Sequence, residues 1–249
     1  MSRDPISTLA DWLGQAKRAV AFTGAGISTE SGIPDFRSPN GIWSKVQPVF
    51  FQDYLKSAES RKEAWSQKVH LHREFGGAKP NAGHTALAQW EKSGRIVGVI
   101  TQNIDELHQE AGSEKVLELH GTARKVVCLR CESLFPVEPY IEEFAKTEVV
   151  PDCPKCGGLL KHATVSFGQA LPEDVLVEAM RISQEADLFL AVGSSLVVYP
   201  AAGLPEIALR SGSKLVIINR DPTAYDDQAD LVIRVPIGDC LSSVDKLLK

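Results

Sequence analysis

Features that would place a chain outside the ordinary globular proteins are missing from this sequence. No apolar run approaches the roughly 20 residues that a membrane-spanning helix needs. The first residues lack the basic and apolar regions of a signal peptide, and there are no internal repeats or low-complexity segments. We therefore expect a soluble, cytoplasmic protein that does not bind membranes.

An excess of basic charge is missing as well. The formal net charge is −5, so the chain has no basic footprint for direct contact with nucleic acid. Hydrophobic residues make up 43% of the 249 positions and charged residues 24%, which is an ordinary globular composition. The length allows one large domain, or a large domain that carries a smaller one.

Cysteine is scarce, yet four of the five cysteines form two Cys-x-x-Cys pairs: Cys128 with Cys131, and Cys153 with Cys156. In a reducing compartment this pattern indicates a metal rather than disulfides. Four thiolates would close the tetrahedral sphere of one structural Zn²⁺ and leave no position for water or substrate. The fifth, Cys240, follows Gly238-Asp239 and favours a packing or main-chain contact over a nucleophile.

Periodicity predicts alternating strands and helices. Asp4 and Pro5 are typical of a helix cap and first turn, before an apolar face of Ile6, Leu9, Ala10 and Leu13. Apolar runs predict buried parallel strands at 19–22, 95–101, 116–119, 188–192, 214–218 and 231–235. Helices are expected at 82–92, 173–185 and 201–211. This alternation predicts an α/β fold with a doubly wound parallel sheet.

Polar residues follow four of these strands. They are Thr23-Gly24-Ala25-Gly26, Gln102-Asn103-Ile104-Asp105, Gly193-Ser194-Ser195 and Asn219-Arg220-Asp221. Ligands of open α/β sheets bind outside the carboxyl ends of the strands, so we expect the four ends to meet at one crevice. Any one of them alone would be equally typical of a solvated turn.

Gly24-Ala25-Gly26 is suited to a phosphate, because glycines let the backbone approach an anion and a following helix start offers free N–H groups. The segment departs from the G-x-G-x-x-G fingerprint, since Ser28-Thr29 stands where the third glycine belongs. No acidic residue follows a second strand about twenty residues on, which argues against an ordinary dehydrogenase.

Among the six histidines, His120 has the most suggestive context. It follows the run 116–119 and precedes Gly121, so a neutral imidazole at a strand end could act as a general base near pH 7. A hydrogen-bonded structural histidine is the alternative from spacing alone. The other five have contexts typical of surface or helix-packing positions. Between 122 and 160 the composition shifts to cysteines and prolines without a long helix pattern, which indicates a small inserted module.

Several motifs together closely resemble those of the sirtuins, a family of NAD-dependent protein deacylases. They occur in the family's order and cover nearly the whole chain. The motifs are Gly24-Ala25-Gly26-Ile27-Ser28, Ser31-Gly32-Ile33-Pro34-Asp35-Phe36-Arg37-Ser38, Gly41-Ile42-Trp43, Thr101-Gln102-Asn103-Ile104-Asp105, Leu119-His120-Gly121, the four paired cysteines, Val165-Ser166-Phe167-Gly168 and Gly193-Ser194-Ser195.

The resemblance implies a Rossmann-like NAD-binding domain and a small domain made of a zinc ribbon plus a helical insertion. The expected divisions are 1–33 with 81–121 and 163–249 for the large domain, 34–80 for the cofactor loop and helical insertion, and 122–162 for the zinc-ribbon module. NAD and an acyl-lysine peptide would meet between the large and small domains.

The resemblance also implies roles for single residues. His120 and Asn103 would be catalytic, and an extended peptide would bind along Val165, Phe167, Gly168 and Val197. The expected NAD contacts are Gly24, Ala25, Gly26, Thr29, Asp35, Phe36, Arg37, Gln102, Ile104, Asp105, Gly193, Ser194, Ser195, Asn219, Asp221 and Cys240.

By this resemblance the chain would be an enzyme that transfers an acyl group from lysine to ADP-ribose and releases nicotinamide and free lysine. Acyl-lysine proteins or peptides would be its partners, and we expect a monomer. His120 would take the proton of a ribose hydroxyl, which for a well-placed general base contributes about 10²–10⁴-fold.

Two departures from the family pattern bear on the substrate. His162 and Gln169 stand where many members have proline and glutamate, so a preference for basic flanking residues is in doubt. Members that favour succinyl- or malonyl-lysine carry a Tyr-x-x-Arg pair in the helical insertion, but 60–80 holds no tyrosine. We therefore expect neutral acyl groups, acetyl first.

Two other functions use the same features. Mono-ADP-ribosyl transfer would label a protein instead of releasing a free ADP-ribose product. A non-enzymatic module that senses NAD or ADP-ribose would bind without releasing nicotinamide.

Overall fold

A computed structural model describes residues 4–36, 41–44 and 46–249. Within them, six parallel strands form one sheet in the order β3-β2-β1-β7-β8-β9. Their bounds are β1 Ala19–Thr23, β2 Ile96–Thr101, β3 Val116–Glu118, β7 Leu188–Val192, β8 Lys214–Ile218 and β9 Leu231–Ile233. The six strands predicted from apolar runs are confirmed, with ends that differ by at most two residues.

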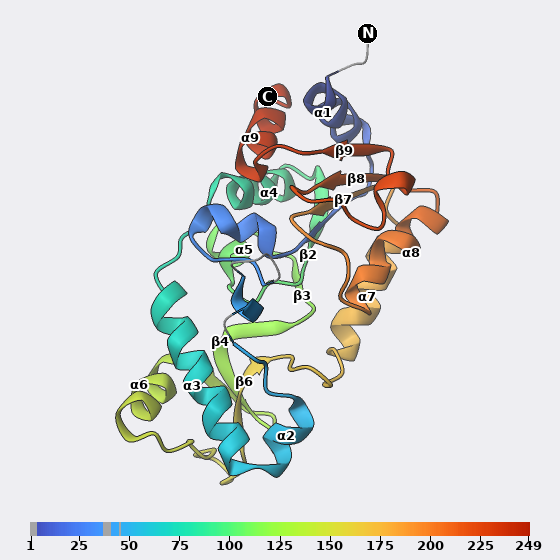
Figure 1. The fold of residues 1–249 in the computed structure, drawn as a ribbon. Coiled ribbons are helices and arrows are strands. Elements are labelled where there is room, and N and C mark those ends of the chain that lie inside the picture. Colours follow the sequence, from blue (N-terminus) through green and yellow to red (C-terminus); the bar gives the residue numbers. More distant parts are fainter. Residues whose placement is uncertain (1–3, 37–40, 45) are drawn as a thin grey trace.

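Helices cover both faces of this sheet (Figure 1). Alternate strand residues point to opposite sides, so Ala19 and Ala21 belong to one apolar core and Val20 and Phe22 to the other. The first core is completed by α1 Pro5–Gln15, α4 Ala82–Lys92 and α9 Ile237–Leu247, and the second by α7 Glu173–Gln184 and α8 Leu204–Arg210. The sheet is therefore doubly wound and Rossmann-like, as predicted.

The amino-terminal helix has the predicted cap, since Asp4 Oδ2 accepts the backbone N–H of Ser7 at 2.9 Å. The predicted helix 201–211 is partly wrong. Residues Ala201–Gly203 form a 3₁₀ turn, η3, before α8 begins at Leu204. Pro205 has no N–H to donate, so a continuous α-helix through this point would lack one hydrogen bond.

A second, three-stranded antiparallel sheet lies in the lower half of Figure 1, in the order β5-β4-β6. Its strands are β4 Gly121–Cys128, β5 Leu134–Pro136 and β6 Leu160–Thr164, and α2 Phe51–Lys56, α3 Ala58–Phe75 and α6 Glu138–Thr147 lie beside it. The ten-residue helix α6 corrects the expectation that 122–160 holds no long helix. Pro139 lies in its first turn, where proline is compatible with a helix, and Ile141 and Phe144 bury one face.

One apolar core joins this sheet to the helices before it. Tyr54 and Trp65 of α2 and α3 pack with Val126, Phe144 and Leu160 from the 122–160 stretch. The Tyr54 hydroxyl donates to the Leu160 carbonyl at 2.5 Å and accepts from Trp65 Nε1 at 3.0 Å. Segments 51–75 and 122–164 thus share a core that is separate from the two cores of the parallel sheet.

The remaining described elements are short. They are η1 Ala25–Ser31, η2 Ile42–Ser44, α5 Leu107–Glu110 and η4 Asp226–Gln228. No helix in the described ranges is both long and apolar enough to cross a membrane.

Candidate active site

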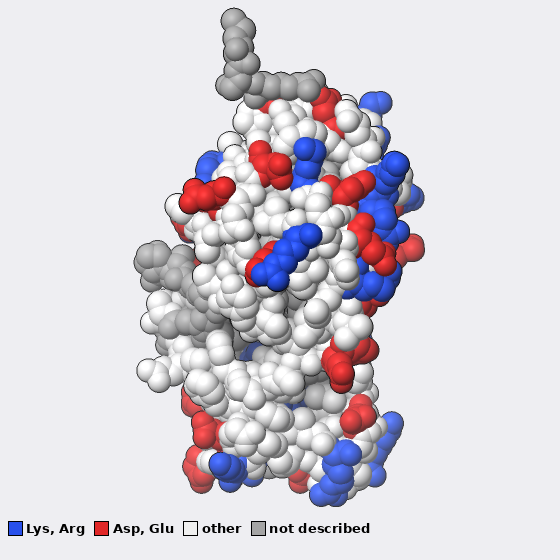
Figure 2. Space-filling view, turned by 90° about the vertical axis from the view of Figure 1, so that its right-hand side faces the viewer, with Lys and Arg blue, Asp and Glu red and all other residues white. Residues whose placement is uncertain are grey.

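A cleft of about 1340 Å³ runs between the carboxyl ends of the parallel strands and the smaller sheet with its helices. Figure 2 shows the surface hollowed between these two halves of the molecule. Strand order reverses between β1 and β7, and the cleft lies at that point, where ligands of doubly wound sheets bind. The predicted convergence of four strand ends is therefore found in the structure.

Most of the residues singled out from the sequence line this cleft. They are Ala25, Gly26, Thr29, Asp35, Phe36, Gln102, Asn103, Ile104, His120, Val165, Phe167, Gly168, Gly193, Ser194, Ser195, Asn219 and Asp221. Gly24, Asp105, Val197 and Cys240 are not among the lining residues. The Cys240 side chain is fully buried in the core beside α4. Arg37 lies outside the described residues.

The glycines after β1 serve close packing of two strand ends. A Cβ on Gly26 would lie 2.7 Å from Gly193 Cα, and one on Gly24 would lie 2.8 Å from the Gly193 oxygen. The N–H groups of Gly24 and Gly26 donate to the carbonyls of Val192 and Gly193 at 3.0 and 2.8 Å. The N–H groups of these two glycines are therefore used between strand ends, and the expected phosphate contact through the following helix start stays a prediction.

His120 stands just after β3 and faces the cleft. Its Nδ1 lies 2.9 Å from the carbonyl oxygen of Gln102, and the His120 carbonyl accepts the Val165 N–H at 2.8 Å. A carbonyl can only accept, so Nδ1 carries the proton and Nε2 is left as the basic nitrogen. The Gln102 side chain donates in turn to Ser194 Oγ at 2.7 Å, which joins the β2 and β7 ends.

Asn103 is buried and held on two sides. Its backbone N–H donates to Thr101 Oγ1 at 3.0 Å, and its Nδ2 donates to Ser28 Oγ at 3.1 Å. Its Oδ1 is buried without a hydrogen-bond partner among the described residues. A buried acceptor is costly when unpaired, so a ligand hydroxyl or amide in the cleft would satisfy Asn103.

Ser28 is the centre of a buried polar network that the sequence did not reveal. Its Oγ donates to Asp105 Oδ2 at 2.7 Å and lies 3.4 Å from His84 Nε2. Behind it, the ring of His84 packs against that of His108, whose Nε2 lies 2.9 Å from Thr23 Oγ1. The network ties β1, β2 and α4 together beneath the cleft.

Both histidines of this network are neutral near pH 7. Burial lowers the pKa of His84 to about 4, although the Asp105 carboxylate opposes the shift. Burial, together with the neighbouring His84, lowers the pKa of His108 to about 3. From the sequence, both histidines have contexts typical only of surface or helix-packing positions, because their partners lie 56 and 85 residues away in the chain.

The outer strand ends are joined by arginines. Arg234 Nη1 donates to the carbonyls of Asn219 and Asp221 at 2.7 and 2.9 Å, which fixes the turn after β8. Arg220 pairs with Asp221 at 2.8 Å and reaches Asp35 Oδ2 at 4.0 Å. The segment around Asp35 is therefore linked to the far side of the cleft.

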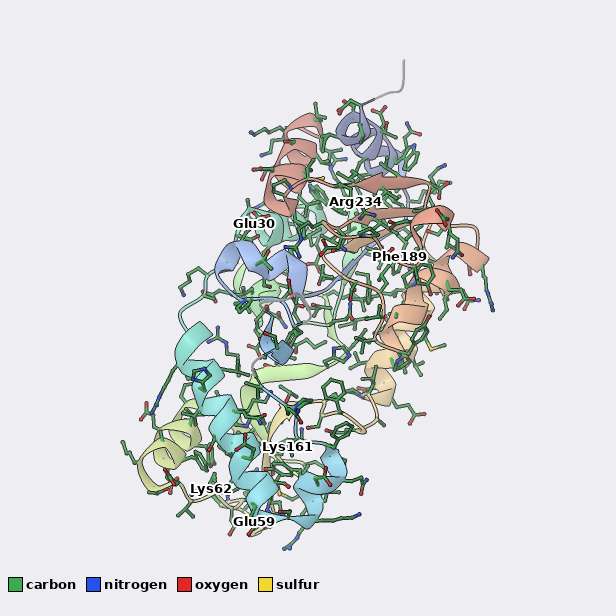
Figure 3. All side chains as sticks on the ribbon, in the orientation of Figure 1. Glu30, Glu59, Lys62, Lys161, Phe189 and Arg234 are labelled. Atoms are coloured by element: carbon green, nitrogen blue, oxygen red, sulfur yellow. The ribbon has the colours of Figure 1, made fainter. Side chains whose placement is uncertain are left out.

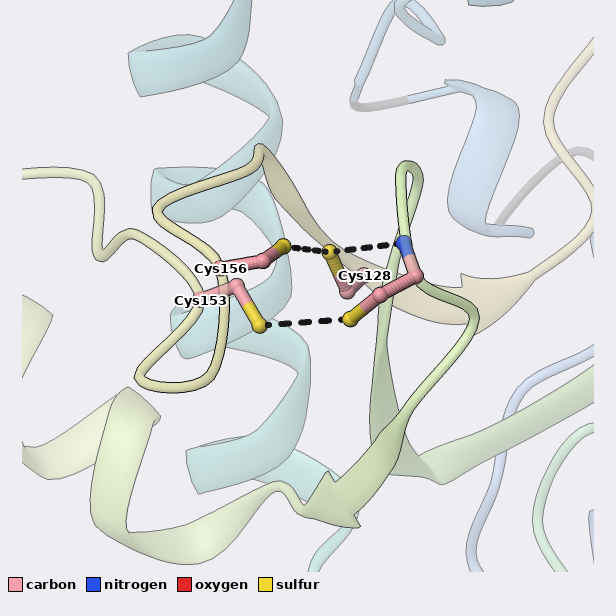
Figure 4. A group of neighbouring side chains, drawn as sticks. Cys128, Cys153 and Cys156 are labelled. Atoms are coloured by element: carbon pink, nitrogen blue, oxygen red, sulfur yellow. Dashed lines mark hydrogen bonds between the residues drawn. The ribbon is translucent and has the colours of Figure 1, made fainter.

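The four paired cysteines meet at the end of the small sheet (Figure 4). Their Sγ atoms lie within 4.8 Å of one another, with Cys128 and Cys156 3.5 Å apart and Cys131 and Cys153 3.7 Å apart. A tetrahedral ion with Zn–S bonds of about 2.3 Å would place the sulfurs about 3.8 Å apart, so the four thiolates fit Zn²⁺. A Cβ on Gly158 would lie 3.0 Å from Cys128 Sγ, which explains the glycine beside this cluster.

Comparison with known proteins agrees with this geometry. The Sir2 family model matches residues 24–200. An NAD-dependent protein deacetylase 1 of Bradyrhizobium diazoefficiens is 46% identical over 96% of this chain and 94% of the relative. A Sir2 complex with a p53 peptide and NAD⁺ superposes with a TM-score of 0.86, at 41% identity and 97% coverage of both chains. Sir2Tm bound to a propionylated peptide gives 0.84, at 42% identity and 98% coverage of both chains.

Proposed function

This chain belongs to the Sir2 family and is an NAD-dependent protein-lysine deacylase, and we propose that the cleft residues described above carry out its reaction. NAD and an acylated lysine react with water to give nicotinamide, free lysine and O-acyl-ADP-ribose. The observation that carries the assignment is that His120 Nε2 and the unpaired Asn103 Oδ1 belong to the same cleft as the β6 end.

NAD supplies a ribose carbon that becomes electrophilic as nicotinamide leaves. Asn103, held by Ser28, is positioned to accept a hydrogen bond from a ribose hydroxyl. Asp105 is proposed to hold the nicotinamide amide; its carboxylate accepts hydrogen bonds from Ser28 Oγ at 2.7 Å and the Leu107 N–H at 3.0 Å, beside the lining residue Ile104. Binding both reactants in one cleft replaces a bimolecular encounter, an effect worth up to roughly 7–11 kcal/mol.

His120 acts as the general base in this proposal. The Gln102 carbonyl holds the proton on Nδ1, so Nε2 takes a proton from the ribose hydroxyl that attacks the acyl carbon. The remaining contacts with NAD are proposed for Gly24, Ala25, Gly26, Thr29, Asp35, Phe36, Arg37, Gln102, Ile104, Gly193, Ser194, Ser195, Asn219, Asp221 and the Cys240 backbone.

For the peptide we propose an extended strand between 165–168 and 196–199. Val165, Phe167 and Gly168 line the cleft beside the end of β6, and the exposed Val197 lies on the opposite segment. Pairing through the main chain reads few side chains, so the flanking sequence should matter little. Acetyl-lysine is the first substrate to test.

We also propose that the chain divides as the sequence suggested, at 1–33 with 81–121 and 163–249, at 34–80, and at 122–162. The shared core of Trp65 with Val126 and Leu160 supports grouping the last two into one small lobe. For location and assembly we propose a cytoplasmic monomer of 27.1 kDa that does not bind nucleic acid or membranes. A four-thiolate zinc site suits a reducing compartment, which supports the proposed location. Light scattering would measure the mass of the particle in solution and so test whether it is a monomer.

The test is nicotinamide release from adenylate-labelled NAD, with and without an acetyl-lysine peptide. Deacylation predicts release that depends on the peptide and a free labelled product. Label attached to protein would indicate ADP-ribosyl transfer instead. NAD binding by zinc-loaded protein without release on acetyl, butyryl or myristoyl peptides would overturn the deacylase assignment in favour of a sensing module.

A further inference from the structure

One lysine faces the cleft from helix α3. Ala64, Gln67, Lys68 and Leu71 are spaced as one face of that helix, and all four line the cleft. Among the described residues, no carboxylate forms an ion pair with Lys68 and no hydrogen bond holds its Nζ. By contrast, Lys62 on the same helix pairs with Glu148 at 2.6 Å. Lys68 therefore lacks a counter-charge among these residues. An ammonium that is shielded from water and has no anion beside it is unfavourable, so an anionic ligand would stabilise it.

A second lysine, on β6, is close enough for the charge of Lys68 to act on it. Lys161 of β6 is buried, and its Nζ donates to the carbonyls of His162 and Thr164 and lies 6.0 Å from the centre of the Phe51 ring. Figure 3 shows Lys161 inside the lower half of the molecule. These neutral acceptors solvate the ammonium but do not cancel its charge.

The charged groups that act on this region are all cationic. Burial, together with the charge of Lys68, lowers the pKa of Lys161 to about 7. Burial, Lys68, Lys161 and His72 lower the pKa of His162. Burial lowers the pKa of Lys68 itself to about 8. No carboxylate contributes to any of the three, so the field at the Lys68 side of the cleft is positive.

Several apolar residues line the same cleft as Lys68. Val46, Pro48, Val49 and Leu71 line the same cleft, which continues to His120. Figure 2 shows Lys or Arg atoms inside this hollow. A hydrocarbon chain would be accommodated by the apolar wall, and a carboxylate at its end would pair with the ammonium.

We propose that Lys68 binds the terminal carboxylate of an acyl chain, so that lysines carrying a dicarboxylic acyl group such as succinyl are substrates. The inference rests on the deacylase function proposed above and names a substrate class for the same cleft. It reverses the expectation that acidic acyl groups are excluded without a Tyr-x-x-Arg pair, because a cation on a different residue supplies the counter-charge.

The test compares two peptides of one sequence that carry succinyl- or butyryl-lysine. Both acyl groups have four carbons, and only succinyl ends in a carboxylate. Values of kcat/KM are measured for the wild type, Lys68→Met and Lys68→Arg. Lys62→Met is the control, because Lys62 lies on the same helix but pairs with Glu148 away from the cleft.

We expect the succinyl-to-butyryl ratio of kcat/KM to fall at least tenfold in Lys68→Met, to be largely kept in Lys68→Arg and to equal the wild-type ratio in Lys62→Met. A wild type that removes butyryl but not succinyl, or a Lys68→Met ratio equal to that of the wild type, would overturn the inference. An acetyl-lysine peptide with neighbouring aspartates tests whether the carboxylate comes from the peptide. A tenfold loss on that peptide in Lys68→Met would also count against an acyl-end site.

Failure of the deacylase function itself is distinguishable from failure of this inference. If the wild type removes no acyl group at all, equilibrium binding of the two peptides decides. Tighter binding of the succinyl peptide that disappears in a folded Lys68→Met protein supports the carboxylate site. Equal binding of both peptides by the wild type overturns it.

Discussion

The imidazole of His120 is fixed by the main chain of Gln102, whose carbonyl oxygen lies 2.9 Å from Nδ1. Because Gln102 directly follows β2 and its own side chain bonds Ser194 at the end of β7, three strand ends set the position of one ring. The acceptor is a backbone atom, so no substitution at Gln102 removes it. The tautomer of His120 is thus set by a backbone carbonyl at the end of β2 and not by a neighbouring side chain.

Replacing His120 by alanine should lower kcat for deacylation by about 10²–10⁴-fold, because the base at Nε2 is lost. The fold should remain, since His120 lies in the cleft rather than in a core. Product formation with an acetyl-lysine peptide measures the effect, and His70→Ala, an exposed position on α3, is the control. A His120→Ala protein with wild-type kcat would remove this residue from the mechanism.

Substitution of Gly26 by alanine tests the packing between the β1 and β7 ends. The new Cβ would stand 2.7 Å from Gly193 Cα and 2.8 Å from its oxygen, both backbone atoms that cannot rotate away. We expect a loss of about 1–3 kcal/mol in the free energy of unfolding and a KM for NAD raised at least tenfold. Gly14→Ala is the control, because its nearest neighbour is a Leu248 side-chain atom at 3.8 Å. Unchanged values for Gly26→Ala would show that the loop adjusts freely.

The sequence predicted the parallel sheet well because its strands are short apolar runs with polar residues at their ends. Leu188–Val192 and Lys214–Ile218 were predicted to the residue. Prediction from the local sequence pattern was wrong about two helices. It placed the start of α8 too early, because Pro205 changes the hydrogen bonding there, and it missed α6, in which only two buried residues mark the helix. The close packing of Gly24 and Gly26 on Gly193 could not be predicted from the sequence, because Gly193 follows a strand far along the chain.

The site was predictable to the extent that its residues follow strands. His120, Asn103 and the Gly193-Ser194 turn stand at strand ends, and the cleft gathers them. The Ser28–His84–His108 network and the position of Lys68 depend on contacts between distant segments, so no spacing in the sequence reveals them. The motif containing Ser28 was the only available signal for that network.

Glu118, at the end of β3, should make stability depend on pH. Its Oε1 is buried without a partner among the described residues, and burial raises its pKa from 4.5 to about 7. A carboxyl with a raised folded-state pKa stabilises the fold below about pH 4.5, and this contribution is lost as the pH rises through 7. Glu118→Gln should therefore be more stable than the wild type above pH 7, by about 1 kcal/mol because the side chain is partly exposed to solvent.

Denaturant unfolding at pH 4.5 and pH 8 measures the effect of Glu118→Gln. The gap between variant and wild type should be present at pH 8 and close at pH 4.5. Glu114→Gln, at an exposed position near the start of the same strand, should show no gap at either pH. A Glu118→Gln protein that is less stable than the wild type at pH 8 would mean that the carboxylate has a stabilising partner.

Removal of zinc should unfold the small lobe alone. Cys128 and Cys153 belong to the core that contains Trp65 and Phe144, whose rings lie 5.7 Å apart, so the metal supports α3 and α6 as well as the ribbon. Structural zinc contributes roughly 10–16 kcal/mol in small peptides, more than a separate core of this size can replace. The parallel sheet has its own two cores, which contain none of the four ligands.

Metal analysis should find one Zn²⁺ per chain, and hydrogen exchange after chelation or in Cys156→Ala should show where protection is lost. Amides of β4, β6, α3 and α6 should exchange quickly, while those of β1, β7 and β8 stay protected. Cys240→Ala is the control, because Cys240 is buried in the α9 core and should leave the zinc in place. If amide protection is lost across both lobes together, the claim that the two lobes have separate cores is contradicted. If no protection is lost anywhere, the zinc ribbon is stable without the metal. The expected result also predicts that chelators inactivate the enzyme, since the α3 wall of the cleft would unfold while the NAD side stays intact.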